Sequence, residues 1–153
     1  MNVADIMTAS PVTIKPHCSV QSAMETMMEI RCHHLPVLSY DKHLVGIVSD
    51  YDCHRALSNR HIACDSQETS PEKIPVNCIM TAAPTTIAPE SSVVEAARLM
   101  FSNNIRCLPV MREETLIGII TTSDILIAFI QMNNNYDNTT PITNNGLHLA
   151  SHQ

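Results

Sequence analysis

The chain is poor in aromatic residues, glycine and positive charge. It has no tryptophan, 3% of its 153 residues are aromatic, and three are glycine. Nine lysines and arginines stand against fifteen acidic residues, for a net charge of −6, and no basic stretch could neutralise a run of phosphates. Few rings are available for stacking on bases. We therefore expect no nucleic-acid partner.

Long apolar segments are also absent. The longest run is Ile125–Ile130, far below the ~20 residues that span a bilayer. The N-terminal residues lack the charged start, apolar middle and small-residue cleavage site of a signal peptide. We therefore expect a cytoplasmic protein that does not enter a membrane. In that compartment the six cysteines are expected to be reduced thiols rather than a disulfide framework.

The dominant feature of the sequence is an internal repeat. A shift of 73 residues superimposes Val3 on Val76 and the triplet Leu-Pro-Val at 35–37 on its twin at 108–110. After a one-residue deletion the match resumes, and Asp52 falls on Asp124. The chain is therefore a duplication of one unit.

Each copy predicts the same order of elements. An extended piece is followed by a segment with apolar residues at helical spacing, Ser19–Ile30 in the first copy. Ser19 and Ser92 are the candidate N-caps, and Ser92 with Glu95 makes a capping box. Two short apolar runs split by a polar turn then predict a hairpin, and a second helix follows. The predicted hairpin runs are 35–39 with 44–49 and 107–111 with 116–121.

These elements divide the chain into four parts. Residues 1–57 and 76–132 are the two β-α-β-β-α repeats of an α/β fold, and the polar stretch 58–75 is a linker. Residues 133–153 are rich in Asn and Thr without apolar periodicity, so we expect this tail to be disordered.

The repeated motifs resemble a known family. Each copy carries I-M-T, P-x-T-I-x-P, S-V-x-x-A-x-x-x-M, L-P-V and L-[VI]-G-I-[VI]-[ST]-x-x-D, a pattern similar to the CBS domain. Two in tandem resemble a CBS pair, or Bateman module. The resemblance implies repeats packed through their sheets with pseudo-twofold symmetry, and two clefts between them. It also implies regulatory binding of AMP, ADP, ATP or S-adenosylmethionine, with no catalytic residue and no obligatory cofactor.

The final acid of the motif suits such a ligand. A carboxylate can accept hydrogen bonds from both ribose hydroxyls, and a helix N-terminus favours phosphate. By the resemblance, the first cleft contains Thr8, Thr13, Cys32, His33, Thr121, Asp124 and Arg106. The second contains Ser49, Asp52, Thr81, Thr86, Ile105 and His34. The candidates for phosphate are Arg106, His33 and His34.

The two clefts are not expected to be equal. The first copy has Asp50 and Tyr51 where the second has Thr122 and Ser123. A further carboxylate costs about 1 kcal/mol for unit charges ~4 Å apart in water, so the Asp124 cleft is the better nucleotide site. The alternative function is an interaction scaffold whose clefts no longer bind. T-x-x-D is also a helix-start signature, and both roles are compatible.

Two further expectations concern metals and assembly. Cys32-His33-His34, Cys53-His54 and His61-x-x-Cys64 leave open a metal- or redox-sensing module. A zinc site needs two paired ligand sets at defined spacing, and only His61 with Cys64 has such a spacing, so we expect no metal. The helix containing Ile125–Ile130 is apolar all round, which indicates burial on more than one side. We therefore expect a homodimer through this helix, acting on an unidentified regulated protein.

Overall fold

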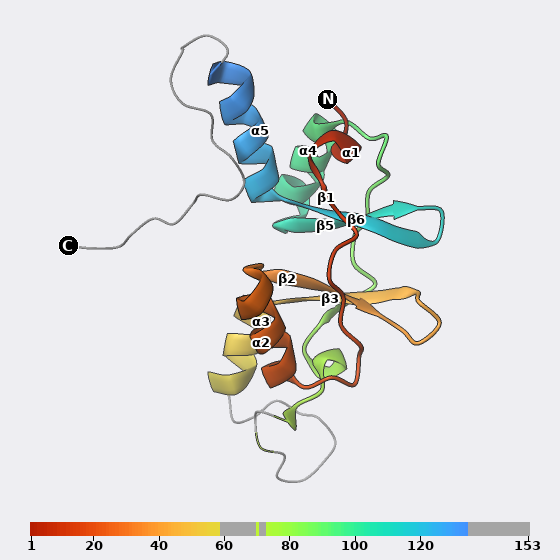
Figure 1. The fold of residues 1–153 in the computed structure, drawn as a ribbon, viewed down its shortest axis with the longest axis vertical. Helices are drawn as coiled ribbons and strands as arrows, with labels where there is room; N and C mark the ends of the chain where they lie inside the picture. The colour runs from red at the N-terminus through yellow and green to blue at the C-terminus, as the bar shows by residue number, and fades with distance from the viewer. Residues whose placement is uncertain (59–69, 71–72, 135–153) are drawn as a thin grey trace, which may run out of the picture.

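The computed structural model describes residues 1–58, 70 and 73–134. These residues form two lobes, each with a three-stranded antiparallel sheet, in the order β2-β3-β4 and β1-β6-β5. The two sheets lie towards the middle of the molecule, and the helices lie on the outer sides (Figure 1). The predicted mixed α/β architecture is confirmed.

The elements alternate as the repeat predicts, with an additional short helix and a two-residue strand at the start of each copy. In chain order they are α1 (Val3–Ile6), β1 (Thr8–Ala9), α2 (Val20–Ile30), β2 (His34–Leu38), β3 (Leu44–Ser49), α3 (Asp50–Ser58), the 3-10 helix η2 (Val76–Cys78), β4 (Thr81–Ala82), α4 (Val93–Asn103), β5 (Cys107–Arg112), β6 (Thr115–Thr121) and α5 (Thr122–Asn134).

Local chemistry explains where the predicted helices begin. The Ser19 hydroxyl accepts a hydrogen bond from the Ser22 N–H, and the Ser92 hydroxyl accepts one from the Glu95 N–H, both at 3.1 Å. Each bond satisfies one N–H that a helix start leaves without an intrahelical partner. Both predicted N-caps are confirmed, and each helix presents its apolar side to its own sheet.

The residues at the start of each copy lie in the lobe of the other copy. Strand β1 pairs with β6, so that Thr8 is opposite Ile119, and β4 pairs with β3 in the same way. The Val3 N–H donates to the Ser91 carbonyl, and the Val76 N–H donates to the Cys18 carbonyl, both at 2.8 Å. The two copies therefore exchange equivalent segments.

This exchange completes the two hydrophobic cores. Val3 is fully buried in the core of the second lobe with Leu108 and Ile120. Val76 is fully buried in the core of the first lobe, with Ile74 beside it. The sequence repeats 1–57 and 76–132 are thus not the units that pack together. Most of the predicted linker 58–75, and residues 135–153 of the predicted tail, lie outside the described residues.

The exchanged strand packs against the glycine of each hairpin motif. A Cβ at Gly46 would meet the side chain of Met80 and would lie 3.0 Å from the Thr81 carbonyl oxygen. A Cβ at Gly118 would meet Met7 in the same way. Glycine is required at both positions because the arriving strand lies against the backbone there. Within the described residues, no helix combines the length and apolarity needed to cross a membrane.

The exchange predicts that Val3, near the N-terminus, stabilises the core of the second lobe. Val3→Ala removes two buried carbon groups from the core of the second lobe, so the free energy of unfolding should fall by about 2 kcal/mol. The matched control is Val12→Ala, because Val12 is 44% exposed. Denaturant unfolding of both variants measures the difference. Equal stability of the two would contradict the described role of α1.

Candidate functional site

Each lobe has a strand–helix junction where the [ST]-x-x-D motif ends a strand and begins a helix. We define the Asp52 junction as His33, His34, Ser49, Asp50, Tyr51 and Asp52, at the end of β3, and the Asp124 junction as Arg106, Cys107, Thr121, Thr122, Ser123 and Asp124, at the end of β6. The strand pairing is equivalent, because His34 is opposite Ser49 and Cys107 is opposite Thr121.

The motif forms a reciprocal helix cap at both junctions. Asp124 Oδ2 accepts hydrogen bonds from the N–H and the hydroxyl of Thr121, both at 2.7 Å. The Asp124 N–H donates to the Thr121 hydroxyl at 3.4 Å. Asp52 Oδ2 accepts from Ser49 N–H and Oγ at 3.0 and 2.6 Å. The predicted capping role is therefore confirmed in both copies. The cap uses only Oδ2, so one carboxylate oxygen remains for another donor.

The predicted clefts combine residues of both copies, with Cys32 and His33 grouped with Asp124, and Ile105 with Asp52. Within its own copy, the His33 carbonyl accepts from the Asp50 N–H at 3.1 Å, and Ile105 packs in the core of the second lobe. The reason is the hairpin: the residues before L-P-V enter the strand that pairs with the motif strand of their own copy. Their part in ligand binding stays a prediction.

The other predicted residues lie along the same sheets. Thr8 is two residues from the register position of Thr121 on the exchanged β1–β6 pair, and Thr81 has the same relation to Ser49. Thr13 and Thr86 each precede a residue that bridges a hairpin strand, Ile14 to Val37 and Ile87 to Val110. Arg106 and His34 are at the junctions to which they were assigned.

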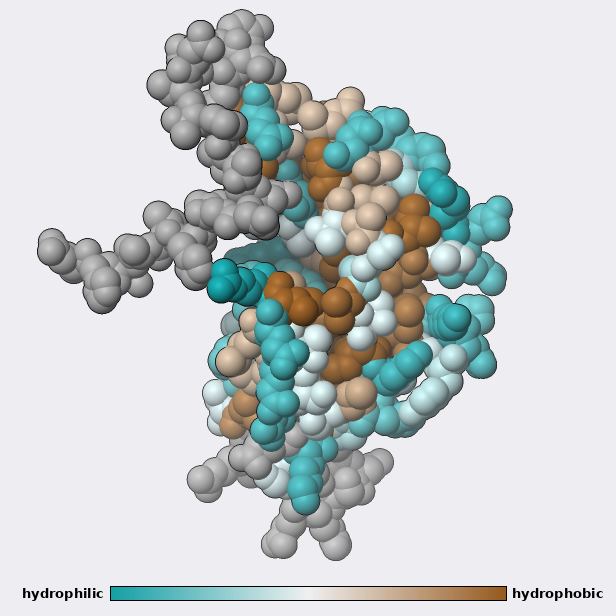
Figure 2. Space-filling view, viewed as in Figure 1, coloured by the Kyte–Doolittle hydropathy of each residue, from teal (hydrophilic) through white to brown (hydrophobic). Residues whose placement is uncertain are grey.

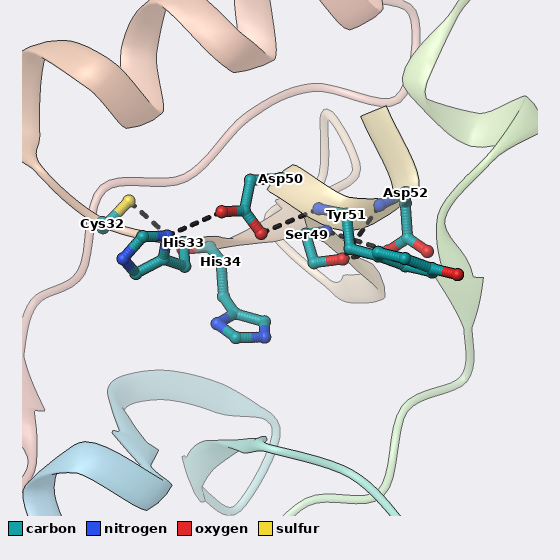
Figure 3. Close-up of polar contacts among 7 residues, drawn as sticks. All are labelled: Cys32, His33, His34, Ser49, Asp50, Tyr51 and Asp52. Carbon is teal, nitrogen blue, oxygen red and sulfur yellow. Dashed lines mark hydrogen bonds and ion pairs between the residues drawn. The ribbon is translucent and has the colours of Figure 1, made fainter. Parts of the chain in front are cut away.

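The charges of the Asp52 junction are concentrated around one ion pair. His33 Nδ1 lies 2.7 Å from Asp50 Oδ2, and Figure 3 shows the imidazole turned to that carboxylate. Partial burial raises the pKa of Asp50, but hydrogen bonds from His33 and from the Tyr51 N–H outweigh it and lower the pKa below the usual range. Asp50 therefore remains ionised down to lower pH than an isolated aspartate.

His34 points away from this pair. Its ring extends from β2 towards the ribbon of the other lobe (Figure 3). Burial lowers the pKa of His34, and the positive charges of His33 and Arg106 act in the same direction, against the carboxylates Asp50 and Asp52. Because Arg106 belongs to the second lobe, the two junctions lie within electrostatic reach of each other.

The expectation that all six cysteines are reduced thiols is wrong. Cys78 is disulfide-bonded rather than a reduced thiol. Cys18, Cys32, Cys53 and Cys107 are free thiols. Within the described residues, no group of three or more His, Cys, Asp or Glu side chains is placed to hold a metal ion. The predicted pair His61 and Cys64 lies outside that range.

A cavity of about 330 Å³ opens at the hairpin turns. It is lined by His43, Leu44, Ala83, Pro84, Thr86, Met111, Glu113 and Glu114. Thr86 is the one residue it shares with the predicted second cleft. Sequence reasoning did not point to the turn residues, because they lie outside every repeated motif.

The rate at which a reagent modifies each cysteine tests how far the thiols are buried. Burial raises the pKa of Cys53 to about 11, with Asp52 adding to the effect, and burial raises the pKa of Cys107 still further. Since the thiolate is the nucleophile, iodoacetamide at pH 8 should modify Cys53 about a hundredfold more slowly than an ordinary thiol, and Cys107 more slowly still. Mass spectrometry of native and denatured protein measures the rates, with the partly exposed Cys18 as internal reference. Labelling of Cys78 without reductant would contradict its disulfide.

The fold and the paired junctions define a tandem pair of α/β domains built from one duplicated unit. The chain belongs to the CBS domain family, which matches residues 3–59 and 76–131. It is 34% identical over 134 residues to a CBS domain-containing protein of Dictyostelium discoideum, covering 85% of this chain and 92% of that protein. It is 36% identical over 125 residues to homoserine O-acetyltransferase of Methanococcoides burtonii, covering 81% of this chain but 23% of that enzyme.

Solved structures share the architecture. CBSX2 of Arabidopsis thaliana in complex with AMP is 29% identical, with a TM-score of 0.70, and the match covers 86% of this chain and 98% of CBSX2. The CBS domain pair of protein MJ0100, in complex with 5′-methylthioadenosine and S-adenosylmethionine, is 26% identical, with a TM-score of 0.76. That match covers 86% of this chain and 98% of the MJ0100 pair.

Proposed function

We propose that this protein is a regulatory module that binds an adenine nucleotide between its two lobes and signals the bound state to a partner protein. Two similar CBS pairs hold AMP, or 5′-methylthioadenosine with S-adenosylmethionine, in their structures. All these ligands contain adenosine, so the shared requirement is a site for adenine and ribose. The acetyltransferase match concerns a small part of that enzyme and supplies no argument for catalysis by this chain.

The observation that carries the proposal is the geometry of Asp124. Its Oδ2 is used by the helix cap, whereas Oδ1 has no hydrogen-bond partner among the described residues. This oxygen can accept from a ribose hydroxyl without loss of the cap. The N-terminus of α5, a helix of thirteen residues, adds the positive end of a helix dipole.

Arg106 supplies the charge that a phosphate needs. Its carbonyl accepts from the Thr122 N–H at 3.0 Å, which fixes the residue beside the start of α5. The side chain takes part in neither ion pair formed by the described residues. An arginine is always charged and can bind phosphate through two parallel hydrogen bonds. AMP is therefore the first ligand to test at this junction.

The exchanged segments suggest how binding is transmitted. Thr8 reaches the Asp124 junction from the first copy, so a nucleotide held there would contact both copies of the repeat. Because each core contains a segment of the other copy, a movement of residues at one junction should displace residues in both lobes. We expect ligand binding to change the relative position of the lobes, and this change to alter the binding of the regulated protein.

Asp124→Ala should weaken AMP binding at least tenfold, because a hydrogen bond to a charged group contributes about 1.5–3 kcal/mol. The substitution also removes a helix cap, so a control must share that loss. Ser92→Ala removes the cap of α4 instead and should cost about 1 kcal/mol of stability without changing the affinity for AMP. Isothermal titration calorimetry measures the affinity of the unmodified protein and of both variants for AMP, ADP and ATP.

Two results would reject the nucleotide proposal. The first is no binding of any adenosine ligand by the unmodified protein at sub-millimolar concentration. The second is an equal loss of AMP affinity in the Asp124→Ala and Ser92→Ala proteins. If a partner is captured equally with and without nucleotide, the interaction scaffold replaces the sensor as the better description.

We further propose that the protein is a homodimer through the α4–α5 face of the second lobe. Helix α4 packs against α5, and the pair leaves large apolar side chains in solvent. Phe101 is 89% exposed, and Leu126 and Phe129 are about 60% exposed. Figure 2 shows further apolar side chains on the visible face near the meeting point of the lobes. A second copy would remove the α4–α5 face from water.

Light scattering after gel filtration tests the dimer. The double substitution Phe129→Lys and Ile130→Lys places two charges on this face and should convert a dimer into a monomer. Tyr40→Lys is the matched control, because Tyr40 is 70% exposed in the turn between β2 and β3, on the other side of the molecule in Figure 1. An unchanged mass in the double variant would exclude α5 as the interface.

A further inference from the structure

The backbone attaches the two exchanged segments to their lobes in the same way. Each segment donates three equivalent backbone hydrogen bonds to the opposite lobe, with lengths between 2.8 and 3.2 Å. The donors of the first segment and their twins in the second are the N–H groups of Val3 and Val76, of Ala4 and Asn77, and of Ser10 and Ala83. Any difference in how firmly the segments are held must therefore come from their side chains.

The side chains at the start of the two segments differ. In the first segment, Asp5 Oδ2 accepts a hydrogen bond from the Asn2 N–H at 2.7 Å, which closes the turn of α1. In the second, Pro75 is the N-cap of η2, and no side chain of the described residues caps that turn. Cys78 stands where the first copy has Asp5, and it is disulfide-bonded. A covalent bond thus takes the position of a hydrogen bond.

Cys78 lies where a reagent in solution can reach it. The residue is exposed, at the C-terminal end of η2. The four other cysteines of the described residues are free thiols, and two of them, Cys53 and Cys107, are buried. The remaining cysteine of the sequence, Cys64, lies outside the described residues. Exposed disulfides are the ones that thiol–disulfide exchange attacks most readily.

Cys78 also lies between the two contacts that anchor the second segment. Val76, two residues before it, is fully buried in the core of the first lobe. Met80, two residues after it, packs against Gly46. A disulfide restricts the conformations that a chain can adopt once it leaves its folded position. Breaking the bond therefore makes local detachment of η2 and β4 more frequent, and it leaves the hydrogen bonds of the first segment unchanged.

We propose that Cys78 is a site of reversible thiol–disulfide exchange that controls how firmly the second exchanged segment is held in the first lobe. The co-reactant is a dithiol. One thiolate of the dithiol attacks the disulfide to give a mixed disulfide, and its second thiol completes the exchange. Two electrons and two protons pass to the protein, which gains two thiols, and the dithiol leaves as a disulfide. The step involves no nucleotide, so it stands or falls independently of the proposed function.

Amide hydrogen exchange of the oxidised and the reduced protein tests the proposal, with dithiothreitol as the dithiol. Peptide mass spectrometry without reductant first establishes that Cys78 is bonded. After reduction, the amides of Val76, Asn77 and Ala83 should exchange at least about tenfold faster, because the segment opens more often. Their three twins in the first segment should exchange at an unchanged rate. Removal of dithiothreitol and addition of oxidised glutathione should restore slow exchange.

Two variants separate the disulfide from other effects of the reductant. Cys78→Ser should exchange like the reduced protein, and dithiothreitol should then have no further effect. Asp5→Ala is the matched variant of the first copy, because it removes the side chain that closes α1. It should accelerate exchange at Val3 and Ala4 in both redox states and leave the second segment unchanged.

Several results would overturn the proposal. Equal exchange rates of the second segment in the oxidised and reduced proteins would do so. An equal acceleration of both segments would show a loss of overall stability rather than the release of one anchor. Failure of the oxidant to restore slow exchange would exclude a reversible site. A free Cys78 thiol in the protein mapped without reductant would exclude the disulfide itself.

Discussion

The exchange of N-terminal segments is the constraint on which the rest of the structure depends. Val3 and Val76 each fill the core of the lobe built by the other copy. The strands that follow them lie against Gly46 and Gly118, where an added Cβ would collide with the side chain of Met80 or Met7 and crowd the backbone of the arriving strand. Neither lobe can therefore form a complete core from one copy of the repeat, and the two lobes must fold as partners.

The same exchange gives both junctions an equivalent backbone setting. The caps made by Asp52 and Asp124 fix both carboxylates at a helix start, and each cap uses one carboxylate oxygen. The symmetric backbone then carries different side chains, His33 with Asp50 at one junction and Arg106 at the other. Duplication thus supplies two junctions of equal backbone geometry, and substitution at a few positions gives them different side-chain charges.

Much of the local structure was predictable because it depends on short-range chemistry. Ser19 and Ser92 were identified as N-caps from their place before apolar residues at helical spacing, and both hydrogen bonds are present. The predicted hairpins also formed. The disulfide of Cys78 was not predicted, because the thiol expectation rested on the compartment rather than on spatial proximity. The grouping of His33 with Asp124 across the lobes stays a prediction, because the hairpin register fixes only the neighbours of His33 within its own lobe.

The sequence alone determined that there are two copies, where the helices α2 and α4 begin, where the hairpins lie, and which copy carries the extra carboxylate. Those features follow from periodicity, capping residues and the identity of Asp50. Only the tertiary structure decided that β1 pairs with β6 and β4 with β3, since a two-residue strand carries no signal for its partner. It also decided that His33 is held by Asp50 while Arg106 takes part in no ion pair among the described residues, because side-chain pairing depends on distances that the order of residues does not contain.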